Sequence, residues 1–513
     1  MKYNYWTGYI SLHVETTESI QMLVTILRQA REYVLKELIC DLTFHDDMLC
    51  SYPTIFNLVG NLYIGTFEQL DPSLVIILPQ ILGSKSREKA IRSVDVIIKS
   101  ETLTSFIDLD QIREIRRAKQ TQDPLFINLP VIPRYSYFPV NIHISAPEVE
   151  AFRYGVLGGT FDHFHPGHCL LLTAAAMTVN IELGIGILSD SMLHDRELQE
   201  LVQNYTLREH QVKRFMNVVA PELALDIFSI QDLIGPAGTD SKYKVIYVNH
   251  KTQSAVGKIN QIRQENQKNP LCEILVDLSN ADQLKLSSTE IRKEINKKSN
   301  YTYLELKNLW KDLTERLEVD PSKSENWFEM ISMQYLRSYR HHHNMVHLHN
   351  LIKLLEESPF ERSDKLLLAL IFHDLIFYPS HKGFEDDRSD EMKSKELYSV
   401  FVIDTNLPEE FFVVGDYILA ATNHKPISET QEEKVFLDLN LSVLASEDYE
   451  SYTSKVRKEY SVFSDEEYYQ KRVLVLKQLL ERESIFYTQY FIDKYEERAR
   501  FNIQREVNKH SIE

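Results

Sequence analysis

The chain has 513 residues, too many for one compact core, because single hydrophobic cores stop growing at about 250–300 residues; we therefore expect several domains. Apolar residues make up 43% and charged residues 26% of the chain, which excludes a wholly disordered or fibrous protein. The 75 acidic and 57 basic residues give a net charge of −18, which argues against a general binder of nucleic acid or anionic membrane.

Features of targeting and redox chemistry are sparse. The four cysteines include no CxxC pair, so neither a disulfide framework nor a thiolate zinc site is indicated. The first residues lack the basic start and apolar core of a secretory signal. The longest strongly apolar run, residues 366–372, falls far short of the ~20 residues that span a bilayer. We expect a cytoplasmic protein without a membrane span.

Residues 1–150 alternate strand-like runs, at 74–82 and 94–99, with helical stretches at 19–38 and 110–118. This alternation predicts an α/β region. Its last part is rich in proline and aromatic residues, which suits a linker because proline interrupts helices and sheets. No chemistry stands out, so the role of this region is left open between regulation and packing.

Residues 151–300 show a clear βαβ rhythm. A buried strand at 152–158 leads through GGTFDHFHPGH into a helical stretch at 169–179, and a second strand follows at 181–189. Alternation of this kind predicts a Rossmann-like parallel sheet that binds ligands at the carboxyl ends of its strands.

Residues 301–513 differ again, because glycine almost disappears and long amphipathic patterns dominate. These patterns predict an all-α domain. The predicted architecture is therefore multidomain: an N-terminal α/β region, a parallel-sheet α/β domain and a C-terminal helical domain, with boundaries near residues 150 and 300.

Two motifs of the middle domain carry residues suited to a phosphate ligand. Gly158 and Gly159 allow a sharp turn and a close approach of the backbone to a ligand, while His165 and His168 precede a helix. A helix N-terminus offers unpaired N–H groups to phosphate. A second helix start offers hydroxyl and amide donors and, one turn later, a cation, in Ser287, Ser288, Thr289 and Arg292.

In this order the motifs resemble the HxGH nucleotidylyltransferase superfamily, and more closely the phosphopantetheine adenylyltransferase domain of eukaryotic CoA synthases. The resemblance covers residues 150–300 and includes YGVLGGTFDHFHPGH, DLIGPAGTD and LSSTEIR. It implies transfer of AMP from ATP to 4′-phosphopantetheine with Mg²⁺, giving dephospho-CoA and pyrophosphate in coenzyme A synthesis. His165 and His168 are the implied catalytic residues. The implied ATP-binding residues are Gly158, Gly159, Thr160, Phe161, His165, His168, Ser287, Ser288, Thr289 and Arg292.

One position departs from the family. A lysine that the family often places after the second strand is Asp190 here, and a carboxylate facing the acceptor phosphate would weaken its binding. Two alternatives stay open: a nucleotidylyltransferase for another phosphorylated acceptor, and a regulatory nucleotide-binding protein with one inactive domain. The GxxxxGK[ST] loop of the kinase that completes CoA is not found in this sequence, so dephospho-CoA is the expected product.

The segment RSYRHHHNMVHLHN of the C-terminal domain is predicted to be helical. His343 and His347 stand four residues apart and so share one helical face, whereas His341, His342 and His349 are predicted to lie at the surface. His373 and Asp374 end an apolar run, and Asp438 is framed by apolar residues. Burying such groups is costly without a partner, and a divalent metal supplies one.

The order H…HD…D resembles the HD superfamily of metal-dependent phosphohydrolases over residues 325–505. The resemblance implies an ion such as Mn²⁺, Mg²⁺, Fe²⁺ or Zn²⁺, with His343 protonating the leaving oxygen and His424 as a weaker ligand or phosphate contact. A family Asn–Glu pair reads Glu385–Asp386 here. Because HD spacing persists in binding-only domains, an inactive scaffold is the alternative. The implied metal ligands are His347, His373, Asp374 and Asp438.

Overall fold

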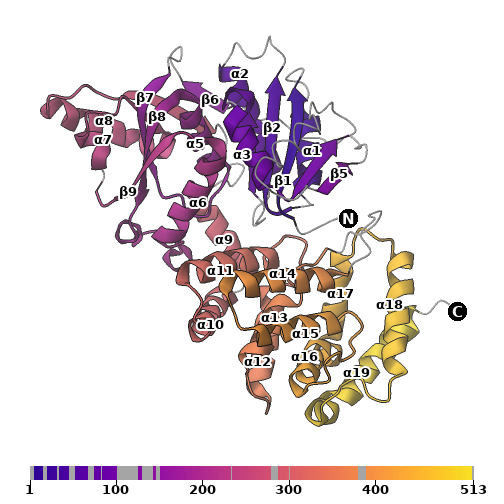
Figure 1. The fold of residues 1–513 in the computed structure, drawn as a ribbon. Helices are drawn as coiled ribbons and strands as arrows, with labels where there is room; N and C mark the ends of the chain where they lie inside the picture. The colour runs from indigo at the N-terminus through magenta and orange to yellow at the C-terminus, as the bar shows by residue number, and fades with distance from the viewer. Residues whose placement is uncertain are drawn as a thin grey trace. The chain divides into compact units, whose positions relative to one another are not determined.

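Figure 1 shows the computed structural model of the chain. Its contacts divide it into two compact units, one formed by Tyr3–Glu294 and the other built on Ile295–Glu513. The domain boundaries near residues 150 and 300 stay a prediction. The predicted helix at 110–118 and most of the predicted linker lie outside the described residues. The structure describes residues 5–14, 20–31, 34–44, 52–67, 74–82, 84–100, 125–129, 142–145, 151–232, 234–278, 287–299, 301–378 and 389–510.

The N-terminal region is built on a five-stranded parallel sheet with the order β3-β2-β1-β4-β5. The strands predicted at 74–82 and 94–99 are confirmed as β3 and β4. The helix predicted over 19–38 ends at Arg31, because residues 34–44 form a strand whose centre is buried in the sheet. The elements are β1 (Tyr5–Val14), α1 (Ile20–Arg31), β2 (Val34–Phe44), α2 (Tyr52–Thr66), β3 (Leu74–Pro79), η3 (Gln80–Leu82), α3 (Ser84–Ser93), β4 (Val96–Ser100) and β5 (Leu125–Leu129).

A second sheet has the order β6-β11-β10-β7-β8-β9. β6 runs antiparallel to β11 and the other pairings are parallel, which confirms the predicted Rossmann-like sheet. The strand order reverses between β7 and β10, and ligands of such sheets bind at the carboxyl ends beside the reversal. The elements are β6 (Ile142–Ser145), β7 (Phe152–Gly159), α5 (Pro166–Thr178), β8 (Val179–Leu188), α6 (Tyr205–Val219), β9 (Ala224–Ile230), α7 (Gly235–Thr239), β10 (Val245–Val248), α8 (His250–Glu265), β11 (Cys272–Leu278) and α9 (Ser288–Ser299).

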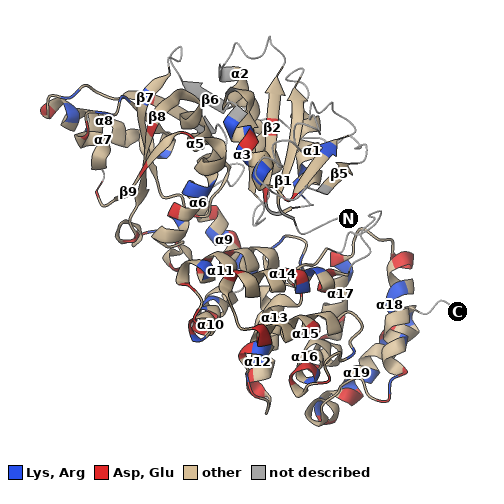
Figure 2. Cartoon of the chain, viewed as in Figure 1, with Lys and Arg blue, Asp and Glu red and all other residues tan. Residues whose placement is uncertain are grey.

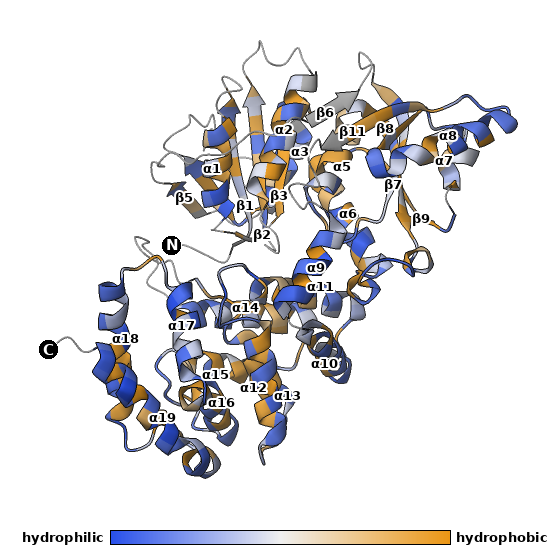
Figure 3. Cartoon of the chain, turned by 180° about the vertical axis from the view of Figure 1, so that it is seen from behind, coloured by the Kyte–Doolittle hydropathy of each residue, from blue (hydrophilic) through white to orange (hydrophobic). Residues whose placement is uncertain are grey.

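The two sheets share one hydrophobic core, and Figure 3 shows hydrophobic residues along the strands of both. The Tyr63 hydroxyl of α2 lies 3.1 Å from Thr173 Oγ1 of α5 and accepts the Ile77 N–H of β3. Ser86 of α3 donates to the Val219 carbonyl at the end of α6 at 3.0 Å. The N-terminal region therefore holds the two helices that follow β7 and β8.

The second unit is helical throughout residues 301–378 and 389–510, which confirms the predicted all-α domain. Phe372 lies at the centre of an aromatic core, with ring centroids 5.1 Å from Phe401 and 6.2 Å from Trp327. Within the described ranges, no helix combines the length and apolarity of a bilayer span. Figure 2 shows acidic and basic residues interspersed over the helices. The helices are α10 (Thr302–Arg316), α11 (Pro321–Tyr335), α12 (Met345–Glu357), α13 (Asp364–Phe372), α14 (Asp390–Thr405), α15 (Val414–Ala420), α16 (Gln431–Leu441), α17 (Tyr449–Glu459), α18 (Asp465–Leu480) and α19 (Gln489–His510).

Candidate functional site

The loop between β7 and α5 forms the first candidate site. His165 is the N-cap of α5: its Nδ1 accepts the Gly167 N–H at 3.2 Å, and Pro166 occupies the first turn, where its missing N–H costs nothing. The His168 ring stacks on His165 with centroids 3.9 Å apart. Both predicted histidines therefore meet at a helix N-terminus, where the positive end of the helix dipole favours an anion.

The turn itself differs from the prediction. Gly158 and Gly159 are residues of β7, whereas φ is +53° at Phe161 and +44° at His163. The prediction of a sharp turn at the glycine pair is wrong; a Cβ on Gly158 would lie 3.0 Å from Ile230 Cδ1, so its small size serves sheet packing. A left-handed backbone is uncommon for a bulky residue, and such strain is typical of ligand-binding segments.

Both histidines are uncharged near neutral pH. Burial lowers the pKa of His165 to about 4, and it lowers the pKa of His168 well below its usual range, with the neighbouring His165 adding to the effect. Nδ1 of His168 is buried and has no hydrogen-bond partner among the described residues. A neutral imidazole has one donor and one acceptor nitrogen, so His168 has hydrogen-bonding capacity left for a ligand.

The start of α9 lies against this loop. Ser288 Oγ donates to the Asp162 carbonyl at 2.7 Å, and Arg292 pairs with the buried Asp162 carboxylate. The two predicted motifs therefore meet at Asp162, a residue that sequence reasoning did not single out. Arg292 is 3% exposed and also donates to the Glu197 carbonyl at 3.0 Å and to Thr289 Oγ1 at 3.3 Å. Its guanidinium joins α9 to the loop, and its expected contact with phosphates stays a prediction.

Two further predicted residues sit at the edges of this arrangement. Ser287 Oγ accepts the Glu290 N–H at 3.3 Å and so caps the first turn of α9. Thr160 follows β7 directly, and its carbonyl accepts a hydrogen bond from Arg208 of α6 at 2.8 Å. Ser287 and Thr160 are therefore held by helices on the two sides of the loop, and their contacts with ATP stay predictions.

Asp190, the residue expected to repel the acceptor, begins the short helix η4 (Asp190–Leu193) after β8. Its carboxylate pairs with Arg208 at 2.7 Å. The Arg208 side chain is fully buried, whereas that of Asp190 is 58% exposed. The negative charge at position 190 is therefore compensated, a feature that the sequence reading missed because the two residues lie on different elements.

Comparison with known proteins defines the class of this domain. The cytidylyltransferase-like family matches residues 156–294. Phosphopantetheine adenylyltransferase of Saccharomyces cerevisiae is 31% identical over 151 residues, 28% of this chain and 50% of the relative. Proteins of the same name from Methanopyrus kandleri and Pyrobaculum aerophilum are 30% and 33% identical, over 28% of this chain and 91% of each relative.

The chain spans about half the length of the yeast relative but nine-tenths of the archaeal ones. The fold, the histidine loop and the family match define a cytidylyltransferase-like nucleotidyltransferase domain. Within that class, the chain belongs to the phosphopantetheine adenylyltransferase family.

The second candidate site lies in the helical unit, where His347 of α12 meets His373 and Asp374 after α13. One ligand atom from each residue lies within 4.8 Å of the others. Nδ1 of His373 is 2.9 Å from the Leu370 carbonyl, which can only accept, so this nitrogen carries a proton. Nε2 of the same ring faces Asp374 Oδ2 at 3.0 Å, and His347 Nε2 is 4.0 Å from that oxygen. If His373 is neutral and its proton is on Nδ1, the lone pair of its Nε2 faces a lone pair of Asp374 Oδ2. A cation bound between the two atoms would remove this repulsion, so these residues fit a metal.

The protonation states agree with metal binding. Burial lowers the pKa of His347 to about 3. Burial acts to raise the pKa of Asp374, but the neighbouring His373 and His343 hold it well below its usual range. A neutral imidazole and an ionised carboxylate are the forms that coordinate a cation.

His343 lies beside this group, with its ring centroid 5.9 Å from that of His347. The helix predicted across this segment begins only at Met345, because the Asn344 side chain caps it, so His343 lies before the helix. Its Nδ1 is 2.7 Å from the buried Glu459 carboxylate of α17. Burial opposes protonation, but Glu459 raises the pKa of His343 above its usual value. A protonated imidazole at this place suits the predicted proton donor.

His342 also belongs to this cluster and does not lie apart at the surface as predicted. Its ring centroid is 4.4 Å from that of His347, and its backbone N–H donates to Glu459 Oε1 at 2.7 Å. Sequence reasoning missed Glu459, which lies more than 110 residues further along the chain.

Asp438 lies outside the metal group. Phe436, two residues earlier on α16, contacts the His373 ring at a centroid distance of 5.7 Å. Because two residues turn a helix by about 200°, Asp438 lies on the opposite face of α16 from Phe436. The fully buried Asp438 carboxylate accepts the N–H of Tyr487 at 2.7 Å, the N–H of Thr488 at 2.8 Å and the Thr488 hydroxyl at 2.6 Å. Burial raises the pKa of Asp438 to about 6. Through these contacts Asp438 anchors the segment that leads into α19, a role that differs from the predicted role as a metal ligand.

His424 is also outside the three-residue group. Its φ is +48°, its carbonyl accepts from Arg482 and Tyr487, and its buried Nδ1 has no partner in the described part of the chain. Its role as a ligand or phosphate contact stays a prediction, and the pair at 385–386 lies outside the described residues.

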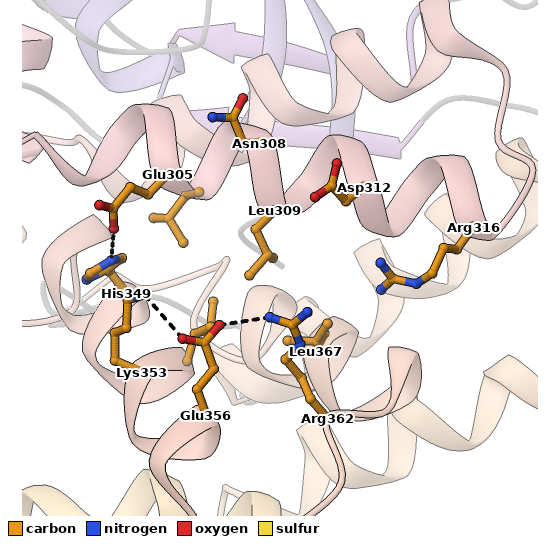
Figure 4. Close-up of a pocket in the computed structure, with 12 residues that line it drawn as sticks. Glu305, Asn308, Leu309, Asp312, Arg316, His349, Lys353, Glu356, Arg362 and Leu367 are labelled. Carbon is orange, nitrogen blue, oxygen red and sulfur yellow. Dashed lines mark hydrogen bonds and ion pairs between the residues drawn. The ribbon is translucent and has the colours of Figure 1, made fainter.

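A pocket of about 300 Å³ lies between α10 and α12 (Figure 4). Most of its charged side chains are already in ion pairs: His349 with Glu305, both Arg362 and Lys353 with Glu356, and Arg316 with Asp364 outside the lining. We assign no ligand to this pocket.

Proposed function

We propose that residues 151–300 transfer AMP from ATP to 4′-phosphopantetheine, giving dephospho-CoA and pyrophosphate. The observation that carries the proposal is the stacked pair of histidines at the N-terminus of α5, at the carboxyl end of a central strand. The activity for which the relatives are named supports the same proposal. We further propose a cytoplasmic location.

In the proposed reaction a phosphate oxygen of the acceptor attacks the α-phosphorus, and the bond from that phosphorus to pyrophosphate breaks. Negative charge develops on the phosphorus oxygens, and the His168 N–H would stabilise it while His165, stacked on the ring, would hold the ring in position. The positive end of the α5 dipole would attract the leaving phosphates, and the hydroxyls of Ser287 and Thr289 would bind them. Mg²⁺, when bound with ATP, would supply further charge compensation.

The test is incubation of the full chain with ATP, Mg²⁺ and 4′-phosphopantetheine, with pyrophosphate and dephospho-CoA as readouts. His168→Ala should lower kcat by about 10²-fold or more, because a contact to the transition state is lost. His510→Ala, the same change at the end of α19, is the matched control and should leave the rate unaltered. Pyrophosphate released only with another phosphorylated acceptor would favour that substrate, and none with any acceptor would favour a binding protein.

For the helical unit we propose metal-dependent phosphohydrolase activity, because His347, His373 and Asp374 present ligand atoms within 4.8 Å of one another. These three residues would hold a divalent ion, which would supply an activated water and polarise the phosphate. His343, whose pKa the neighbouring Glu459 raises, would donate a proton to the leaving oxygen. The substrate class is a phosphate ester, including 4′-phosphopantetheine or a nucleotide.

Elemental analysis of the purified full chain should find a bound divalent metal that His373→Ala loses and His349→Ala keeps. Phosphate release from p-nitrophenyl phosphate, 4′-phosphopantetheine and nucleotides is then measured with Mn²⁺ and Mg²⁺. Metal binding without turnover on any of these esters would leave an inactive scaffold as the better account.

A further inference from the structure

Arg208, on the first turn of α6, connects three separate segments around the first site. Its Nη1 donates to the Thr160 carbonyl at 2.8 Å, its Nε to the Gln203 carbonyl at 2.9 Å, and its Nη2 to Asp190 Oδ1 at 2.7 Å. The side chain has no solvent exposure. Its plane lies near the Tyr205 ring, 5.7 Å from the centroid. A guanidinium offers donors in several fixed directions, which an ammonium group does not.

The segment that Arg208 holds is the strained one. Phe161 and His163 have left-handed backbones, and Arg208 fixes the residue directly before them. Arg292 and Ser288 of α9 fix Asp162 in the middle of the segment. Backbone conformations of this kind persist only where the surroundings determine them from several sides.

Charge gives the second half of the argument. A partner of opposite charge offsets the cost of burying a guanidinium, and Asp190 supplies one while keeping 58% of its side chain exposed. Without Arg208, the Asp190 carboxylate would stand after β8 uncompensated, where it would repel a phosphorylated acceptor. The pair therefore explains how a site with a carboxylate at this position can accept an anionic substrate.

We propose that Arg208 is a positioning residue for the acceptor side of the adenylyl-transfer site: it fixes the Thr160 carbonyl and neutralises Asp190. This inference rests on the proposed function. The acceptor is then a phosphate monoester that lies near the Asp190 carboxylate, paired with Arg208, and not near a free cation. Arg208 acts through Asp190 and Thr160 and does not touch the substrate.

The test is a double-variant cycle in the full chain with Arg208→Met, Asp190→Asn and the combination. Arg208→Met should raise KM for the acceptor about tenfold through one unpaired charge, and lower kcat about 10²-fold through displacement of the loop. Adding Asp190→Asn should restore most of the acceptor KM, because the repelling charge is gone, and leave kcat low. KM for ATP should change far less than KM for the acceptor.

Arg263 offers a matched control, because it is also fully buried in the same unit and donates to backbone carbonyls, among them those of Asn269 and Ala237. Arg263→Met should cost comparable thermal stability without changing the ratio of the two KM values. If Arg208→Met does not fold, Asp190→Asn alone decides: it leaves the buried cation unbalanced, so acceptor KM should fall and become more dependent on salt.

Outcomes separate this inference from the activity on which it rests. No pyrophosphate from the wild-type chain would reject the proposed function itself. If the wild type is active, two results would overturn the role of the pair. One is an equal acceptor KM in Arg208→Met and in the double variant; the other is an Asp190→Asn variant with the acceptor KM and salt dependence of the wild type. Recovery of kcat in Arg208→Lys would overturn the positioning of Thr160 by the guanidinium.

Discussion

Asp438 offers the sharpest test of how the helical unit is built, because a ligand and an anchor respond differently to one substitution. Its carboxylate is fully buried and accepts three hydrogen bonds, all at 2.8 Å or less, from Tyr487 and Thr488. Asp438→Asn keeps the shape but replaces one oxygen by an NH₂ group that faces donors. Each hydrogen bond to a charged group contributes about 1.5–3 kcal/mol, and a buried donor left unpaired adds its own cost.

We therefore expect Asp438→Asn to lower the unfolding free energy of the helical unit by about 3 kcal/mol. For a unit of this size that corresponds to a fall in Tm of roughly 6–12 °C. Calorimetry at pH 7.5, above the pKa of about 6, keeps the wild-type carboxylate ionised. Thr488→Val should cost about 1 kcal/mol and should not add fully to Asp438→Asn, because the two residues share a hydrogen bond.

Metal content decides between the two roles. His347, His373 and Asp374 remain in place in Asp438→Asn, so the purified variant should bind as much metal as the wild type. A variant that loses its metal while keeping wild-type thermal stability would show that Asp438 is a ligand and that the anchoring argument is mistaken.

Three further outcomes are expected. Because burial lowers the pKa of His165 to about 4, the unfolded first unit binds a proton there that the folded unit does not, so this residue should lower stability by up to about 3 kcal/mol between pH 7 and pH 4. His165→Gln should reduce the pH dependence in urea titrations, and His168 should account for part of what remains. Tyr63→Phe removes the hydroxyl shared by Thr173 and the β3 backbone and should cost about 1–2 kcal/mol, and an unchanged unfolding midpoint would refute this. Glu459→Gln should lower the pKa of His343 in an NMR titration, and an unchanged pKa would show that Glu459 does not control the protonation of His343.

Much of the fold follows from patterns that lie within short stretches of sequence. The alternation of strands and helices predicts the parallel sheet of residues 151–300, and amphipathic periodicity predicts the helical unit. Burial on both faces makes strands such as LVIILP continuously apolar, so they stand out. One exception is the helix predicted over 19–38, where sheet pairing of residues 34–44 overrides the local pattern.

The candidate sites were predictable where the residues sit on one element and not where they meet across elements. His165 and His168 follow from spacing at a helix start, and His373 and Asp374 from an apolar run that ends in two polar groups. Arg208, Asp162 and Glu459 were missed because their partners lie 18 to 130 residues away. For Asp438, local sequence does not fix which way a residue of a buried helix faces.

The same long-range contacts indicate what the N-terminal region does for the first site. α6 carries Arg208 on its first turn, at the loop, and Arg214 six residues later, where Arg214 pairs with Glu37 of β2. α5 begins with the histidine pair and packs through Thr173 against the N-terminal region. Helices are stiff over such lengths, and packed interiors transmit displacement, so the first sheet sets the position of both helix starts. The archaeal relatives match almost entirely within the second sheet, so this support is an addition to the domain they share with the chain.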